Sequence, residues 1–91
     1  MYILVVYDIS DDKRRRLIDK LLSSYGYRVN YSVFEIEINH SKYAKLITSL
    51  TKLSDKKSDH IRIYRLNKES LAKSLVVHKD IGIFDNETLY F

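Results

Sequence analysis

Hydrophobic and polar residues follow patterns along the chain that switch several times between strand and helix periodicity. Residues 2–7, Tyr-Ile-Leu-Val-Val-Tyr, form an uninterrupted apolar run, which is typical of a central strand buried on both faces. Ser10, Asp11 and Asp12 then offer capping oxygens and first-turn acids for a helix. Gly26 follows that helix as a candidate C-terminal cap. The apolar face of the helix recurs at helical spacing: Leu17, Ile18, Leu21, Leu22 and Tyr25.

The second half of the chain repeats the alternation of strand and helix. Phe34, Ile36 and Ile38 alternate with glutamates, which predicts a half-buried strand whose acidic face is solvated. Residues 28–31 form either a separate short strand or the kinked start of the same ribbon. A polar turn precedes a second amphipathic helix, and a polar loop at 54–59 then leads to a strand at 60–66. The apolar stripe of the second helix is Tyr43, Leu46, Ile47, Leu50 and Leu53.

The predicted order β-α-β-β-α-β is that of a ferredoxin-like α+β domain, with two helices packed on an antiparallel sheet. Residues 75–77 and 81–84 are β-prone pieces beyond this complete unit. An extra terminal strand without a place in its own sheet often completes that of a neighbour, so we expect a homodimer formed through this segment. We therefore assign 1–79 to the domain with its exchanged C-terminal strand and 80–91 to a tail of the same domain.

The composition fits one small intracellular domain. The chain has 91 residues and no cysteine, so disulfides and thiolate metal sites are excluded and a reducing compartment is the natural setting. No apolar run is long enough for a signal peptide or a membrane span. We expect a cytoplasmic protein that does not act in a membrane.

The charge is uneven along the chain. The net charge is +4, and all 16 Lys and Arg residues lie at or before Lys79. Three acids follow it: Asp80, Asp85 and Glu87. A basic body with an apolar, weakly acidic tail indicates a polyanionic partner for one surface, although the charge also serves solubility.

Asp8 is the sharpest single candidate for chemistry. It places a carboxylate at the carboxyl end of the first strand, the edge of α/β sheets where ligands tend to bind. An Asp after a strand is often only a turn residue. However, Ser10, Asp11 and Asp12 already supply the capping groups, which favours a different task for Asp8.

Four consecutive cations, Lys13 to Arg16, lie at the predicted start of the first helix, with Lys20 one turn on. The helix dipole is positive there, so each cation forgoes roughly 0.3–1 kcal/mol before screening. A bound phosphate would compensate, because free amides and guanidinium groups both suit it. The alternative is a solvated helix face balanced by Asp11, Asp12 and Asp19.

A twofold axis would bring two copies of Asp8 together. Mg²⁺ is commonly held by one or two carboxylates with waters and phosphate oxygens, so we expect Mg²⁺, with Mn²⁺ as an alternative. The three histidines, His40, His60 and His78, are scattered without the spacing of a metal site, and we interpret them as surface or loop residues. Ser32 lacks a visible His and Asp arrangement, which favours a polar role.

Four segments in this order carry a family resemblance: Tyr7-Asp8-Ile9, residues 11–16 (Asp-Asp-Lys-Arg-Arg-Arg), Tyr25-Gly26, and residues 31–35 (Tyr-Ser-Val-Phe-Glu). Together they resemble CRISPR-associated protein two (Cas-two), the small adaptation protein that works with the CRISPR integrase. The resemblance covers nearly the whole chain, and residues 1–35 carry most of its specificity. Asn30 departs from the pattern, since a glutamine usually stands there.

The resemblance implies a ferredoxin-like homodimer that exchanges its C-terminal strand, bridges integrase dimers and holds duplex DNA. Some members are magnesium-dependent nucleases on RNA or DNA, so single-stranded RNA is a further candidate partner. By resemblance Asp8 is the metal ligand, Tyr7 and Ser32 belong to the catalytic site, and Phe34 is structural near it. The implied nucleic-acid contacts are Lys13, Arg14, Arg15, Arg16 and Arg28.

Four functions compete at this point. The leading one is a DNA-holding subunit for spacer acquisition, and the second is an autonomous metal-dependent endonuclease that uses Asp8. The third is a toxin-type ribonuclease of the virulence-associated D group, which shares the fold. The fourth, a regulatory module for a small molecule, is disfavoured by the basic helix start and the lack of glycine-rich turns.

Overall fold

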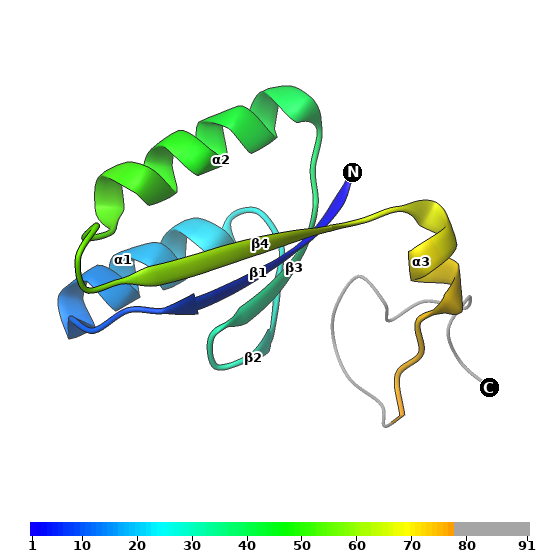
Figure 1. Cartoon of the computed structure of the whole chain (residues 1–91), viewed down its shortest axis with the longest axis horizontal. Coiled ribbons are helices and arrows are strands. Elements are labelled where there is room, and N and C mark those ends of the chain that lie inside the picture. The colour runs from blue at the N-terminus through cyan, green and yellow to red at the C-terminus, as the bar shows by residue number, and fades with distance from the viewer. Residues whose placement is uncertain (78–91) are drawn as a thin grey trace.

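The computed structural model describes residues 1–77 of the chain (Figure 1). Strands and helices alternate as the residue pattern predicts, and a short third helix follows the last strand. The elements are β1 (Tyr2–Asp8), α1 (Asp12–Ser23), β2 (Tyr27–Asn30), β3 (Val33–Glu37), α2 (His40–Leu53), β4 (His60–Leu66) and α3 (Lys68–Lys73).

The four strands form one antiparallel sheet in the order β2-β3-β1-β4. β1 is a central strand, with β3 on one side and β4 on the other. In this register Val5 lies opposite Phe34 on β3 and Ile63 on β4. The predicted ferredoxin-like α+β order is therefore confirmed.

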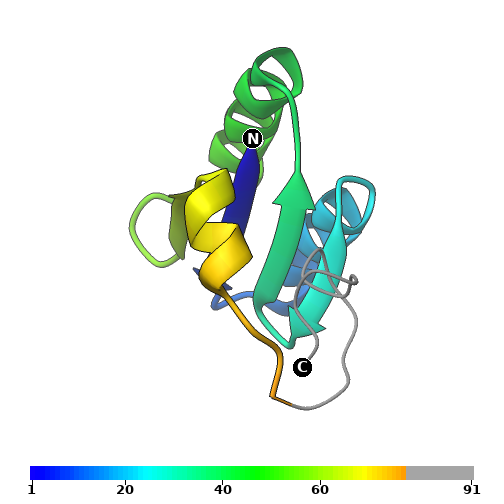
Figure 2. The ribbon, with the colours of Figure 1, turned by 90° about the vertical axis from the view of Figure 1, so that its right-hand side faces the viewer.

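The hydrophobic core lies between the sheet and the two long helices, both of which cover the same face of the sheet (Figures 1 and 2). Alternate residues of β1 and β3 point into this layer because side chains alternate across a strand. The fully shielded side chains are Ile3 and Val5 from β1, Phe34 and Ile36 from β3, Ile18 and Leu22 from α1, and Leu46 from α2. Burial of each large apolar side chain contributes roughly 1.5–3 kcal/mol.

The burial of β1 differs from the prediction that both of its faces are buried. Tyr2, Leu4 and Val6 are only half-buried and Asp8 is exposed, whereas the alternate residues are buried. The reason is that α1 and α2 lie on one side. The continuous apolar run of β1 correctly predicts a central strand, but its burial on both faces is not seen within residues 1–77.

The ends of α1 are set by residues near those predicted. Asp11 is the N-cap and accepts a hydrogen bond from the Arg14 amide at 2.9 Å. The helix ends earlier than the glycine suggested, since Ser24 is the C-cap. The Gly26 amide still donates to the Leu22 carbonyl oxygen at 3.0 Å, but the main constraint on this glycine is its close approach to β3.

The remaining boundaries agree in part. β2 is a separate strand that begins and ends one residue earlier than predicted, and its register shifts between Arg28 and Asn30. β4 has the predicted bounds. The helix α3 was not predicted, and residues 75–77, predicted to be β-prone, form no strand. The other β-prone piece, 81–84, lies outside the described residues.

Replacement of Gly26 by alanine should destabilise the fold by about 1–3 kcal/mol. A Cβ there would lie 2.3 Å from the carbonyl oxygen of Glu35 and 2.6 Å from Cγ1 of Ile36, and the first of these is backbone that cannot swing away. Urea unfolding measures the change. The control is Ser23→Ala at the exposed end of α1, expected within about 0.5 kcal/mol of the unchanged protein. Equal stability of the two variants would contradict the close approach.

Candidate functional site

Asp8 lies where three segments of the chain meet. It ends β1, and in the antiparallel register it stands directly opposite His60, the first residue of β4. On the other side, the Tyr7 amide donates to the Ser32 carbonyl oxygen at 3.1 Å, which brings the β2–β3 turn beside the end of β1. The structure therefore places the predicted site residues Tyr7, Asp8 and Ser32 at one end of the sheet.

The carboxylate of Asp8 differs from its neighbours. It is exposed, and within residues 1–77 it makes no hydrogen bond or ion pair. The surrounding carboxylates all have partners: Asp11 caps α1, Asp12 pairs with Arg15, Asp19 pairs with Arg28 and Asp59 pairs with Arg14. Asp8 is thus available to a ligand, and capping does not depend on it.

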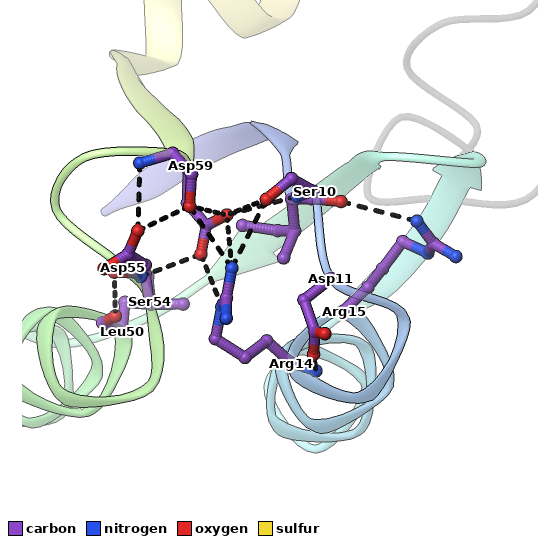
Figure 3. A network of polar contacts seen from close by, with 10 residues as sticks. Ser10, Asp11, Arg14, Arg15, Leu50, Ser54, Asp55 and Asp59 are labelled. Atoms are coloured by element: carbon purple, nitrogen blue, oxygen red, sulfur yellow. Dashed lines mark hydrogen bonds and ion pairs between the residues drawn. The ribbon is translucent and has the colours of Figure 1, made fainter.

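Arg14 is held by Asp59, which precedes β4 (Figure 3). Its Nε donates to Oδ2 of Asp59 at 2.9 Å and its Nη2 to Oδ1 at 3.2 Å, a two-pronged contact that is among the stronger charge-assisted hydrogen bonds. The amides of Ser10 and Asp55 donate to the same carboxylate at 3.1 and 2.8 Å. We call this arrangement the Arg14–Asp59 clamp. It joins the β1–α1 connection to the loop between α2 and β4.

The clamp changes the acidity of Asp59, whose side chain is fully shielded from solvent by its neighbours. The hydrogen bond from Arg14, followed by the backbone hydrogen bond from Asp55, holds the pKa of this carboxyl well below its usual range. Desolvation acts in the opposite direction but is outweighed. Asp59 is therefore ionised at neutral pH, and its charge is part of the folded structure.

A second network holds the β2 side of the site. The Tyr7 hydroxyl donates to Asp19, and the Arg28 guanidinium pairs with the same carboxylate at 2.9 Å. Arg28 also lies over the ring of Phe34, 5.4 Å from its centroid, a cation–π contact. The Tyr31 carbonyl oxygen lies 3.5 Å from the Tyr7 hydroxyl, so the β2–β3 turn adjoins this network.

The same network makes Tyr7 a hydrogen-bond donor. Burial, together with the hydrogen bond to Asp19, raises the pKa of the Tyr7 hydroxyl above its usual value. The hydroxyl is therefore protonated at neutral pH and orients Asp19. Phe34 is fully buried and stacks on the Tyr7 ring, with centroids 6.3 Å apart. Catalytic roles for Tyr7 and Ser32 stay predictions.

The five predicted nucleic-acid contacts fall into two groups. Arg14, Arg15 and Arg28 are each engaged in an ion pair, so a phosphate contact by any of them stays a prediction. Lys13 and Arg16 are exposed, and in the described part of the chain neither has an ion-pair partner.

Two further exposed cations belong to the same end of the molecule. Lys56 and Lys57 lie in the loop that the Arg14–Asp59 clamp ties to the start of α1. We call Lys13, Arg16, Lys56 and Lys57 the basic rim. The residue pattern showed the loop only as polar, because nothing local reveals that it folds against α1.

A single chain supplies few metal ligands. Within residues 1–77 no group of three or more His, Asp or Glu side chains comes together. One chain thus offers the Asp8 carboxylate and, across the strand pair, the imidazole of His60. Such a donor set fits a divalent cation only if phosphate oxygens, water or a second chain complete the coordination.

The model of the family described as CRISPR associated protein Cas2 matches residues 1–74. A CRISPR-associated endoribonuclease Cas2 from Chloroflexus aurantiacus is 38% identical over 84% of this chain and 82% of its own. The crystal structure of Streptococcus pyogenes Cas2 at pH 6.5 has a TM-score of 0.75 and 34% identity, covering 86% of this chain and 100% of that one.

A chain of a partial Cas6-RT-Cas1–Cas2 complex has a TM-score of 0.71 and 28% identity, with 84% of this chain and 83% of that one covered. A separate finding concerns the membrane: among the described residues, no helix has the length and apolar character needed to cross one.

Substitution of Asp59 by asparagine should lower the urea midpoint of unfolding at neutral pH and flatten its acid dependence. Because the folded pKa is depressed, the ionised carboxylate stabilises the fold above about pH 4 and loses that effect as the pH falls towards the folded value. The gap between the two proteins should therefore be widest at neutral pH and narrow below pH 4. The control is Asp12→Asn, whose ion pair with Arg15 is exposed. A gap that stays constant with pH would contradict this assignment.

Proposed function

The chain belongs to the family of CRISPR-associated protein Cas2, and on this premise we propose that it is a homodimeric subunit of CRISPR adaptation that holds duplex DNA for the integrase during spacer acquisition. The match over residues 1–74 supports the family role. The structural relative that comes from a complex containing Cas1 supports the integrase as partner. The toxin-type ribonuclease is not favoured, since the family model and the similar proteins named above are Cas2. We propose the cytoplasm as its place of work.

The proposal that the chain holds DNA rests on one observation about the cations at the start of α1. Some of them are engaged in ion pairs, and the others are exposed and have none in the described part of the chain. Arg14 is engaged in the clamp, and the clamp ties the loop that contains Lys56 and Lys57 to the start of α1. The basic rim thus provides four exposed cations at the end of the molecule where α1 begins. The positive end of the α1 dipole favours anions at the same end. Contacts of this kind position the phosphate backbone without reading sequence, which suits a subunit that must hold varied DNA.

Two features support the homodimer. β4 is an edge strand within the described sheet, and exposed strand edges are ready to pair with another chain. The open sheet face also carries Tyr64, which is exposed, and the half-buried Leu4 and Val6. A C-terminal strand from a second copy would cover this edge. A small domain gains stability from such association.

A metal-dependent endonuclease on RNA or DNA is the second candidate, favoured by the exposed and unpartnered Asp8. The endoribonuclease name of relatives supports it. We propose that Asp8 holds Mg²⁺ or Mn²⁺, with phosphate oxygens and the Asp8 of a second chain as further ligands. Such an ion polarises a phosphodiester and activates water. The Tyr7 hydroxyl donates a hydrogen bond to Asp19, and a catalytic role for Tyr7 stays a prediction.

Substitution of Lys13 and Arg16 by alanine should weaken duplex DNA binding and reduce the slope of log affinity against log salt. Each lost phosphate contact lowers that slope by about 0.9, so the pair should lower it by about 2. Fluorescence anisotropy across a salt series measures both effects. The control is Lys42→Ala with Lys45→Ala on α2, which removes the same charge elsewhere. An unchanged slope would remove the basic rim from the DNA interface.

Substitution of Asp8 by alanine separates the two candidate functions. Metal-dependent cleavage should fall by about a hundredfold or more, because the cation loses its carboxylate. Integrase binding and spacer acquisition should persist, since they depend on the scaffold. Cleavage is measured on labelled RNA and DNA, and acquisition by the growth of a repeat array in cells. Asp12→Ala, at another exposed carboxylate, serves as the control.

Loss of acquisition in the Asp8 variant, with the dimer and the integrase complex intact, would refute the scaffold-only proposal. Cleavage that is unchanged in the same variant would instead refute the nuclease assignment. Each candidate therefore has its own decisive outcome.

A further inference from the structure

Asp8 and His60 form a facing pair at the end of the β1–β4 ladder. In an antiparallel pair, facing residues project to the same side of the sheet with Cβ atoms about 4.5–5.5 Å apart. Asp8 alternates with the buried Tyr7, so the pair lies on the face opposite α1 and α2. A carboxylate and an imidazole are thus side by side on the open face.

Both side chains are available to a ligand. Asp8 and His60 are exposed, and over residues 1–77 neither side chain takes part in a hydrogen bond or an ion pair. The next position of β4 on this face is Arg62, which faces Val6. Its Nη1 lies 3.4 Å from the Tyr64 hydroxyl, so Arg62 is directed along β4 towards Tyr64 and away from the pair.

Asp8 offers a carboxylate oxygen and His60 an imidazole nitrogen, and metal ions differ in how well they bind these two ligands. Mg²⁺ takes oxygen ligands and keeps several waters, so it gains little from an imidazole. Mn²⁺ also favours oxygen ligands, but as a transition metal it accepts an imidazole nitrogen beside a carboxylate oxygen more readily than Mg²⁺ does. Asp8 alone would discriminate only weakly between the two cations, whereas a nitrogen ligand from His60 would strengthen the preference for Mn²⁺.

We propose that His60 is a second protein ligand of the divalent cation held by Asp8, and that this ligand makes the site prefer Mn²⁺ to Mg²⁺. The inference deepens the metal-dependent function proposed above and rests on it. In a homodimer each chain contributes the same oxygen and nitrogen pair, so the preference does not depend on where the dimer axis passes.

Pulsed electron paramagnetic resonance of Mn²⁺ added to the full chain tests the nitrogen ligand directly. A nitrogen bound to Mn²⁺ produces a hyperfine coupling, which shifts in a defined way when the histidines carry ¹⁵N. We expect this coupling in the unchanged protein. It should vanish in His60→Ala and remain in His40→Ala, a control at the start of α2, because α2 begins after β3 at the opposite end of the sheet.

Metal affinities give the second measurement. His60→Ala should weaken Mn²⁺ binding by about tenfold or more while Mg²⁺ binding, measured by competition, changes little. His60→Asp replaces the nitrogen by oxygen, so it should retain Mg²⁺ binding and lose the preference for Mn²⁺. Urea unfolding of each variant checks that the fold is kept.

The outcomes of these experiments distinguish a failure of the His60 inference from a failure of the proposed metal binding by Asp8. Mn²⁺ that binds in an Asp8-dependent way without a nitrogen coupling would overturn the role of His60 and leave the metal at Asp8. Mn²⁺ binding that is unchanged in Asp8→Asn would overturn the metal assignment itself, and the role of His60 with it. A coupling that persists in His60→Ala would also overturn the inference, because another nitrogen would be the ligand.

Discussion

The ion pair between Arg14 and Asp59 fixes the end of the molecule where all the candidate chemistry lies. Asp59 is shielded from solvent and accepts hydrogen bonds from Arg14 and from the amides of Ser10 and Asp55. A buried carboxylate left without these partners would carry a large desolvation cost. The contact therefore holds the β1–α1 connection against the start of β4. It also fixes the position of His60, because His60 directly follows Asp59 in the chain.

The clamp also decides which cations of α1 remain free. Consecutive residues of a helix point in directions about 100° apart, so four adjacent cations cannot share one task. Arg14 and Arg15 turn towards Asp59 and Asp12, while Lys13 and Arg16 stay exposed. Two of the four consecutive cations thus form ion pairs within the fold. The exposed cations Lys13 and Arg16 lie at the same end of the molecule as the loop that carries Lys56 and Lys57, because the clamp ties this loop to the start of α1.

The parts of the structure that depend on local pattern could be predicted from the sequence, and the parts that depend on long-range register could not. The periodicity of β4 predicted its bounds, and the apolar face of α1 predicted its packing. The clamp joins residues 45 positions apart, and no local signal marks Asp59 as a partner of Arg14. The pattern interprets His60 as a surface or loop residue, and it is exposed. Its place opposite Asp8 could not be predicted, because that place exists only in the folded register of β1 and β4.

The two kinds of ligand expected here meet opposite faces of the same strand end. The basic rim belongs to α1 and the α2–β4 loop, on the helix side of the sheet, whereas Asp8 and His60 lie on the open side. To bind the basic rim and also bring a phosphodiester to Asp8, a nucleic acid would have to reach from the helix side of the sheet to its open side. In the proposed functions, DNA holding uses the basic rim and cleavage uses Asp8, so the first does not require the second.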